Sequence, residues 1–549
     1  MADEQRRVYL AIVLSVIVLI GWELMMGPQV VPIDAVPEAP TTDVVKDALD
    51  SAGDTVISPE AADGAAALAN ADEESAVDTA PAVVEERNIP RNDGLLRQTW
   101  TNDGPVIKRL ELVNYTERNE DDEMESVKLT DSKQRQAKLS IASDQMPFTG
   151  RWNVEDSGTT QVFTSTQANG LAWRLELQKA TTDYTTDVML TVSNTSDRPI
   201  VSEANLELFI NYPEEGSFLA PPLMYRGLCY DAEDELQDAE QGDVEDGPIE
   251  LVTSGAKWAA VDYQYFLVAA IARENVAGGC KAKAGDDIIE LSYQLLFETL
   301  PAGQSKSIRY SLFAGPKSSD ELKAVSSDLT FAIDYSIMGI PLGALARPMI
   351  LALNVFHDMS QSWGIAIILL TFVVKLILFP VTYKSVVSMR KMQLLKPELD
   401  KIKTRFPNDK EKQQMAQLKL MQEQGVNPLG GCLPMVLQMP VWFALYRALW
   451  SAVDLYQQSF LWIADLTQPE PFPVLAILVG GVTALQQKVT PTTGDPQQAK
   501  MMMIFMPIML TVFMVALPSG LVFYVLVNSV LSIVQQVVIN RRVPRLQPA

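Results

Sequence analysis

The chain is poor in histidine and cysteine, two residue types on which many catalytic and metal sites depend. Its 549 residues include one histidine, His357, and three cysteines. It has neither the glycine-rich phosphate loop with its lysine nor the paired-histidine zinc motif. A nucleophile activated by histidine would depend on His357 alone, for which we expect a structural role. These shortages predict that the protein is not an enzyme and uses no cofactor or metal ion.

The three cysteines are too few for a disulfide framework. Cys229 and Cys280 both fall in the acidic half of the chain, where one bridge can form if that half lies outside the cytosol. Two buried free thiols are the alternative. Cys432 lies in an apolar segment and has no evident partner.

Charge is distributed unevenly along the chain. The formal net charge is −24, yet residues 385–425 carry nine basic residues against five acidic ones. The tail after residue 540 adds Arg541, Arg542 and Arg545 without an acidic residue. An acidic, soluble-looking half and a basic, apolar half therefore indicate two compartments.

The first 90 residues predict an anchor and a tether. An apolar run of about 19 residues follows Arg6-Arg7, which is near the length that crosses a bilayer, and no signal-peptidase pattern follows it. We expect an uncleaved span over residues 1–27. Residues 28–90 are rich in Ala, Pro, Asp, Glu and Thr, a composition typical of a disordered acidic linker.

Residues 91–325 have the alternating pattern of strands in a β-sandwich. An acidic, solvated loop is predicted at 232–248. The predicted strands are Val106–Val113, Ser126–Leu129, Thr160–Ser165, Leu171–Leu177, Thr186–Val192, Ala204–Ile210 and Ile288–Phe297.

The remaining chain predicts a helical membrane region, giving six spans in all. Residues 326–360 are amphipathic, with Pro341 and Pro348 as breaks, and predict an interfacial helix. The second span falls in 361–384, a basic helical hairpin in 385–428, and a short basic tail in 541–549. Spans three to six occupy 429–540, as Leu429–Trp450, Phe472–Val489, Met501–Leu517 and Leu521–Ile539.

The distribution of basic residues sets the orientation. With Arg6-Arg7 in the cytoplasm, six spans place both termini and the basic hairpin inside. Residues 28–360 then lie outside.

Lys375 is the most informative residue, because it is the only ionisable side chain within 364–381. A charge at that depth is costly unless it faces water or a partner, so it indicates function. Snorkelling is the alternative, but Lys384 near the cytoplasmic edge is roughly 13 Å away along the helix. Polar residues on several spans predict a wet cavity open to the cytoplasm, although each could instead bond a neighbouring helix. They are Thr371, Gln438, Thr483, Gln486, Gln487, Asn528, Ser529, Ser532, Gln535 and Gln536.

Ordered motifs between residues 363 and 540 carry a family resemblance. They include WGIAIILLTFVVK at 363–375, NPLGGCLPMVLQMP at 427–440 and PSGLVFY at 518–524. This region resembles the YidC family of membrane protein insertases. The domain at 91–325 fits the extra periplasmic β-domain of Gram-negative members. The resemblance implies a multi-pass protein of the bacterial inner membrane with five core helices around a hydrophilic groove open to the cytoplasm.

The resemblance also implies roles for particular residues. Lys375 takes the position of the groove cation, usually an arginine, which receives the hydrophilic part of a substrate. The substrate groove is expected to contain Lys375, Thr371, Gln438, Tyr524 and Asn528. The surface along which the apolar segment slides into lipid is expected to contain Met435, Met439, Trp442, Phe443, Phe505, Met506, Met509 and Phe513. The cytoplasmic recruitment loop is expected to use Arg390, Lys391, Lys396, Lys401, Lys403 and Arg405.

The partners implied are nascent membrane proteins, the Sec translocon with its accessory subunits, and the lipid bilayer. The short tail predicts weak ribosome docking, and no nucleic acid is expected as a direct partner. Two other functions stay open from the residues alone. A secondary transporter would require paired repeats, which we do not find. An assembly chaperone would bind helices through the methionine-rich surface without translocating a segment.

Overall fold

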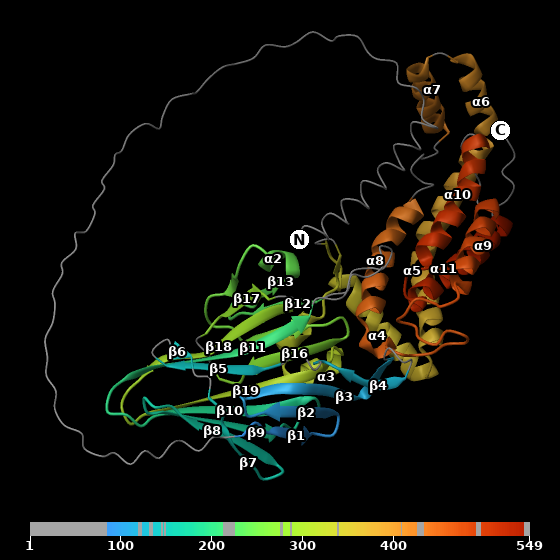
Figure 1. The fold of residues 1–549 in the computed structure, drawn as a ribbon. Helices are drawn as coiled ribbons and strands as arrows, with labels where there is room; N and C mark the ends of the chain where they lie inside the picture. The colour runs from blue at the N-terminus through green and yellow to red at the C-terminus, as the bar shows by residue number, and fades with distance from the viewer. Residues whose placement is uncertain are drawn as a thin grey trace, which may run out of the picture. The chain divides into compact units, whose positions relative to one another are not determined.

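The computed structural model describes most of the chain after residue 84 (Figure 1). The described residues form one compact unit. The predicted anchor, most of the linker, the segment around Cys432 and the end of the tail lie outside them. The described ranges are 85–118, 123–130, 136–143, 146–147, 150–211, 225–274, 278–285, 288–337, 340–407, 409–424, 433–489 and 496–542.

The first part of the unit is an all-antiparallel β-domain. The three main sheets have the orders β1-β2-β3-β4, β13-β12-β15-β16-β19-β10-β9-β8-β7 and β14-β17-β18-β11-β5-β6. The strands are β1 (Asn88–Asn92), β2 (Leu96–Thr101), β3 (Val106–Arg118), β4 (Met124–Lys128), β5 (Lys138–Ser143), β6 (Met146–Pro147), β7 (Asn153–Asp156), β8 (Thr160–Thr166), β9 (Leu171–Lys179), β10 (Thr185–Asn194), β11 (Ile200–Asn211), β12 (Arg226–Tyr230), β13 (Leu236–Ala239), β14 (Ile249–Val252), β15 (Trp258–Asp262), β16 (Phe266–Ala272), β17 (Cys280–Ala284), β18 (Ile288–Leu300) and β19 (Ser305–Pro316).

Alternating side chains explain these strands. In β9, Leu171, Trp173, Leu175 and Leu177 are buried while the residues between them are not, so one face packs on the core. All seven predicted strands are present, and the β prediction is confirmed as a large antiparallel domain. Its sheets share one hydrophobic core.

A disulfide joins the two larger sheets. Cys229 of β12 bonds Cys280 of β17, and both side chains are fully buried. The structure thus settles the choice between a bridge and two free thiols in favour of the bridge.

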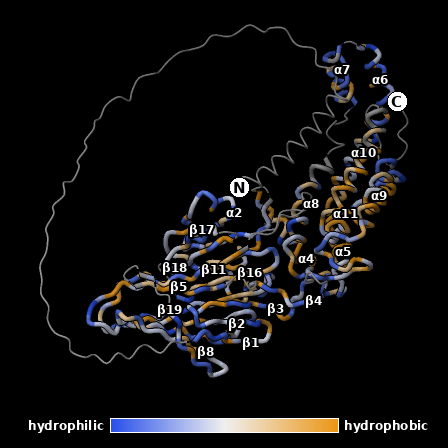
Figure 2. Tube along the Cα trace, viewed as in Figure 1, coloured by the Kyte–Doolittle hydropathy of each residue, from blue (hydrophilic) through white to orange (hydrophobic). Residues whose placement is uncertain are grey.

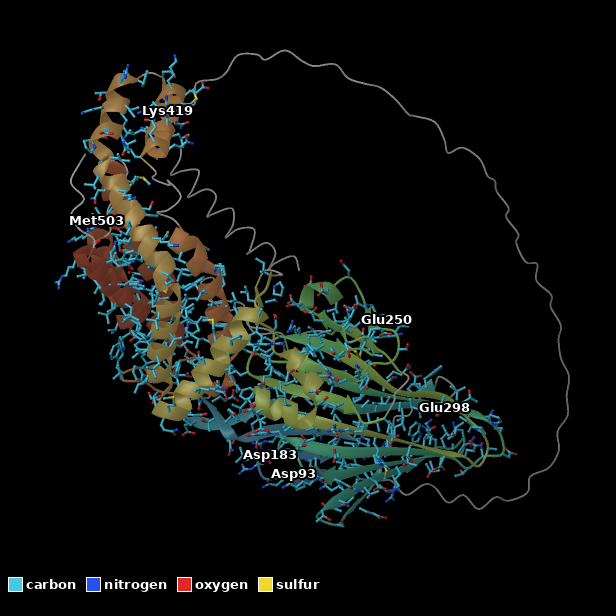
Figure 3. The ribbon with its side chains drawn as sticks, turned by 180° about the vertical axis from the view of Figure 1, so that it is seen from behind. Asp93, Asp183, Glu250, Glu298, Lys419 and Met503 are labelled. Atoms are coloured by element: carbon cyan, nitrogen blue, oxygen red, sulfur yellow. A yellow bond between two sulfur atoms is a disulfide. The ribbon has the colours of Figure 1, made fainter. Side chains whose placement is uncertain are left out.

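Two features of the β-domain differ from the prediction. The strand β1 begins at Asn88, inside the predicted linker. The segment 232–248 is not a plain solvated loop, because it contains β13 and the short helix α2 (Gln241–Val244). Ala239 and Val244 are buried, which holds this acidic segment against the domain. Exposed acidic side chains also lie elsewhere on the domain, for example at Asp183, Glu250 and Glu298 (Figure 3).

The connection to the helical region is more broken than the predicted interfacial helix. It contains α3 (Ser319–Val325), the 3-10 helix η1 (Ser327–Ala332) and the small hairpin of β20 (Ser336–Ile337) and β21 (Ile340–Pro341). The helix α4 (Gly343–Ser360) begins only after Pro341 and contains Pro348. Both faces of α4 are apolar: Met349 and Leu353 are buried, whereas Leu351 and Met359 are exposed.

The helical region is apolar along most of its length (Figure 2). In the described residues, α5 and α11 are long and apolar enough to cross a bilayer, and α9 and α10 contain shorter apolar stretches. The helices are α5 (Trp363–Leu394), α6 (Lys396–Arg405), α7 (Lys410–Glu423), α8 (Leu433–Ser451), α9 (Val474–Val489), α10 (Pro496–Met514) and α11 (Ser519–Arg542), with the 3-10 turn η3 at Val453–Leu455.

The predicted helical hairpin is present, but it begins later than expected. The helix α5 continues through residues 385–394, because Val386 and Met392 are buried there. The helix α6 ends at Arg405 and α7 begins at Lys410, where the Asp409 side chain accepts a hydrogen bond from the Lys412 backbone and caps α7.

Candidate functional site

Lys375 projects from the middle of α5 and is half-buried. Its Nζ donates a hydrogen bond to Ser532 Oγ of α11 at 2.7 Å, and that hydroxyl donates to the Asn528 carbonyl one turn earlier. A lysine and a serine 157 residues apart are therefore joined across two apolar helices.

A second polar contact joins α8 to α11. Gln438 Nε2 donates to the Tyr524 hydroxyl at 3.2 Å, and Tyr524 is almost fully buried. Thr371 behaves differently, because its hydroxyl donates to the Ile367 carbonyl of its own helix at 2.6 Å. The structure thus brings Lys375, Gln438, Tyr524 and Asn528 onto three packed helices, while Thr371 is turned back on α5.

The packing around these groups changes along the helices. A buried apolar cluster fills the end of the bundle near the β-domain, with Leu370 and Ala366 of α5, Leu445 of α8, Val479 of α9 and Leu521 of α11. A much smaller cluster of Val386 and Ile539 lies at the hairpin end. Lys375 and Ser532 fall between the two clusters and are only partly buried. The buried apolar cluster therefore closes the end of the bundle near the β-domain, whereas the layer at Lys375 is only partly buried.

The predicted sliding surface is largely open. Met439 of α8 and three residues of α10, Phe505, Met509 and Phe513, are each 43–46% exposed. Trp442, Phe443 and Met506 are partly buried, and the Met435 side chain lies outside the described residues. In the described chain, α10 packs on α9 and α8 packs on α4 and α5, with no extensive contact between α8 and α10.

The predicted recruitment residues lie on two helices. Arg390 and Lys391 belong to the end of α5, and Lys396, Lys401, Lys403 and Arg405 belong to α6. Lys401, Lys403 and Arg405 are exposed, as is Lys419 of α7 (Figure 3). The His357 ring stacks on Trp363 at 4.0 Å, which agrees with a structural role.

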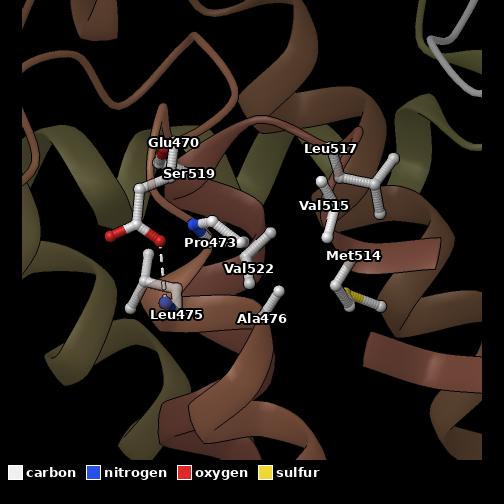
Figure 4. Close-up of a pocket in the computed structure, with 9 residues that line it drawn as sticks. All are labelled: Glu470, Pro473, Leu475, Ala476, Met514, Val515, Leu517, Ser519 and Val522. Atoms are coloured by element: carbon white, nitrogen blue, oxygen red, sulfur yellow. Dashed lines mark hydrogen bonds between the residues drawn. The ribbon is translucent and has the colours of Figure 1, made fainter. Parts of the chain in front are cut away.

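A small cavity lies at the end of the bundle opposite the basic hairpin, between α9, α10 and α11 (Figure 4). Its volume is about 10 Å³, enough for about one water molecule. The Glu470 carboxylate beside it accepts hydrogen bonds from the Leu475 backbone and the Trp462 indole, so it caps α9. No group of three His, Cys, Asp or Glu side chains in the described residues is placed to hold a metal ion.

Two family comparisons cover nearly all of the described chain. Residues 92–352 match the YidC periplasmic domain, and residues 355–546 match the 60Kd inner membrane protein family.

Individual relatives agree. A membrane protein insertase YidC of Geotalea daltonii is 30% identical over 564 residues, covering 98% of this chain and all of the relative. One from Anaeromyxobacter dehalogenans is 40% identical over 323 residues, which span 58% of each protein. A solved YidC insertase structure with its first transmembrane domain resolved is 19% identical, covers 82% of this chain and 92% of that one, and has a TM-score of 0.36.

The Geotalea relative aligns along its full length, and the two family matches follow one another in the order of the β-domain and the helical region. The chain therefore belongs to the YidC membrane protein insertase family, as an inner-membrane protein with a periplasmic domain.

Proposed function

We propose that this protein inserts other membrane proteins into the inner membrane, by receiving their hydrophilic segments in a groove at Lys375 and releasing their apolar segments into lipid. The observation that carries the proposal is the bond from Lys375 Nζ to Ser532 Oγ, in a partly buried layer below a closed apolar cluster. A lysine that is only partly buried at this depth in an apolar helix is hard to explain by packing alone.

The proposal includes six spans, with both termini and the basic hairpin in the cytoplasm. Two observations support this direction. The end of α8 at Trp450 bonds the β-domain, whereas the basic helices α6 and α7 precede the opposite end of α8. The Cys229–Cys280 disulfide favours an oxidising compartment for the β-domain, such as the periplasm.

Electrostatics supplies the first step. Lys375 attracts an acidic or polar substrate segment into the groove, so that the segment crosses a thinner layer of hydrocarbon. Lysine provides a point charge without the planar, bidentate guanidinium of arginine. Charge attraction to the substrate segment therefore matters more here than a fixed hydrogen-bond geometry. The membrane potential adds about 2.3 kcal/mol per charge per 100 mV.

Burial of the substrate in lipid supplies the driving free energy. The open faces of α8 and α10 present flexible methionines and aromatic rings, which suit apolar segments of many shapes. Because these helices share no extensive contact in the described residues, a substrate helix can leave between them.

The partners follow from this mechanism. Nascent membrane proteins are the substrates, and the exposed basic residues of α6 attract them to the groove. The protein acts alone or with the Sec translocon and its accessory subunits, and docks the ribosome only weakly.

Charge reversal at Lys375 tests the proposal. In vesicles, Lys375→Glu is expected to reduce insertion of a single-span client with an acidic outer tail by tenfold or more. Lys375→Arg keeps the charge and is expected to stay within twofold of the parent. Lys384→Glu is the matched control, because Lys384 is exposed on the same helix outside the groove.

The outcome separates two functions. Full insertion by Lys375→Glu would contradict the groove mechanism. If that variant still prevented aggregation of helical clients, the exposed methionine surface would instead support an assembly chaperone.

A further inference from the structure

A buried ion network lies where the β-domain meets the end of α8. Asp262 of β15 is fully buried and accepts hydrogen bonds from Arg226 Nε at 3.1 Å and from Lys317 Nζ at 2.6 Å. Asp334, which follows η1, accepts a hydrogen bond from Arg447 Nη2 of α8 at 2.9 Å. Arg226 Nη1 lies 4.0 Å from Asp334 and links the two halves.

The charges of this network balance. Arg226, Lys317 and Arg447 face Asp262, Asp334 and the more exposed Asp238, which accepts from Arg226 Nη1 at 3.0 Å. Buried charges persist only when they are paired and hydrogen-bonded. Arg447 is 8% exposed, so its position depends on a carboxylate that α8 does not itself provide.

Apolar and polar contacts extend the junction beyond the ions. Tyr456, just after η3, lies with its ring 5.2 Å from Tyr265, 5.5 Å from Phe266 and 6.2 Å from Tyr115. Val453 of η3 is buried and packs in the β-domain core.

Two hydrogen bonds complete the junction. Thr116 Oγ1 donates to Gln457 Oε1 at 2.7 Å, and Gln264 Nε2 donates to the Trp450 carbonyl at 3.4 Å. The loop after α8 therefore docks into the β-domain through core contacts as well as charges.

We infer that the Arg447–Asp334 pair, which Arg226 of β12 links to the β-domain, fastens that domain to α8. Arg447 is then a positioning residue which holds α8 in the place needed for insertion. The consequence for insertion rests on the proposed function. Because α8 carries Gln438 and part of the sliding surface, a tilt of its outer end moves both relative to α5 and α11. The β-domain thus acts as a fixed brace for the groove.

Cross-linking measures the docking directly. Thr116→Cys and Gln457→Cys are introduced with Cys432→Ser, and the initial rate of disulfide formation is measured in vesicles. A protease site in the turn at residues 406–409 yields two fragments that stay joined only when the new bond is present.

The variants test the ion pair by charge. Arg447→Asp is expected to reduce the cross-linking rate at least fivefold. The double variant Arg447→Asp with Asp334→Arg is expected to recover part of that loss, because Asp334→Arg restores the pair but also places a cation beside Arg226. Lys306→Asp is the matched control, because its partner Glu298 is about half exposed on the β-domain surface. Asp334→Asn removes one charge at constant size and is expected to give an intermediate loss, which covers the case in which Arg447→Asp does not fold.

Insertion is measured on the same variants. We expect Arg447→Asp to lower insertion several-fold and the swapped pair to restore it in part. An unchanged cross-linking rate in both Arg447→Asp and Asp334→Asn would overturn the fastening. If a variant lost the cross-link but inserted clients at the parental rate, the positioning role would be overturned. Lys375→Glu is expected to leave cross-linking unchanged, so a failure of the proposed function appears in a different assay.

Discussion

The β-domain and the helical bundle are stabilised in opposite ways. The β-domain has one continuous core that includes the fully buried Trp100, Trp152, Trp173 and Trp258. The bundle has a well-filled core only toward the β-domain, and its helices expose many large apolar residues elsewhere. In water, burial of apolar surface drives folding, whereas in a bilayer lipid covers it equally well.

This difference explains where a polar site can exist. A cavity in the β-domain core would lose contacts and stability, because protein interiors are close-packed. In the bundle, the partly buried layer at Lys375 is tolerated because the closed end fixes the helices. We therefore expect a core substitution in the β-domain to cost more stability than a comparable substitution in the bundle.

The largest stability effect is expected for a core tryptophan. Trp258 is 1% exposed and stacks on Tyr230 at 5.4 Å, so Trp258→Ala should destabilise the β-domain by about 3–5 kcal/mol. Trp462→Ala removes the same side chain from an exposed position and should have a much smaller effect. Pulse proteolysis in urea compares the two. An equal loss of stability in the two variants would show that the exposed Trp462 stabilises the bundle as strongly as a core tryptophan stabilises the β-domain.

Removal of the disulfide should have the next largest effect. Cys229→Ser with Cys280→Ser opens a link across 51 residues and is expected to cost about 2–4 kcal/mol. The same change tests the comparison, because the bundle has no part in this bond. Unfolding of the β-domain should shift under non-reducing conditions, while protease resistance of α5 should not. A shift in both would mean that the two regions unfold together.

A hydrogen bond inside the bundle should contribute less. Tyr524→Phe removes the acceptor of Gln438 Nε2 and keeps the ring, so we expect a loss of about 0.6 kcal/mol. Thermal unfolding in detergent measures it, with Tyr383→Phe on an exposed ring as the control. A loss above about 2 kcal/mol would place Tyr524 in a larger network than this one bond.

Periodicity predicted the fold where one face of an element is exposed. The strands β9 and β10 alternate and were found from sequence. By contrast, β12 and β15 are buried at every position, and their patterns do not distinguish a strand from a buried helix segment. The length of α5 was underestimated for a related reason, since Val386 is buried only through contact with a distant segment.

The sequence was enough to identify Lys375 as the central residue of the candidate site, but it did not predict which side chains contact it. Lys375 is conspicuous because it is a lone charge in an apolar run, yet its partner Ser532 was one of many polar residues. Helical spacing does not tell which face of α11 meets α5. The Arg447–Asp334 pair was missed. Arg447 is the only charged residue of the predicted span 429–450 and could have been noticed for the same reason as Lys375, but 113 residues separate it from Asp334 and no pattern in the sequence pairs them.

The smallest expected effect is a pH dependence at the junction of the two regions. Burial, followed by the charge of Asp320, raises the pKa of Asp454, and the nearby His357 opposes this. Burial, then Asp183 and Asp320, likewise raises the pKa of Glu321. A carboxyl whose pKa is higher in the folded state stabilises the fold below that pKa, and this contribution is lost as the pH rises through it.

The Asp320→Asn variant isolates this contribution. It removes the charge common to both shifts, so the parent should lose more thermal stability than the variant as the pH rises from the ordinary carboxyl range toward neutrality. Asp246→Asn, on the acidic segment of the β-domain, is the control and should follow the parent. If Asp320→Asn also followed the parent, burial, together with Asp183 in the case of Glu321, would account for the shifts. The junction would then respond to pH through packing, as the β-domain core does, and not through the charge of Asp320.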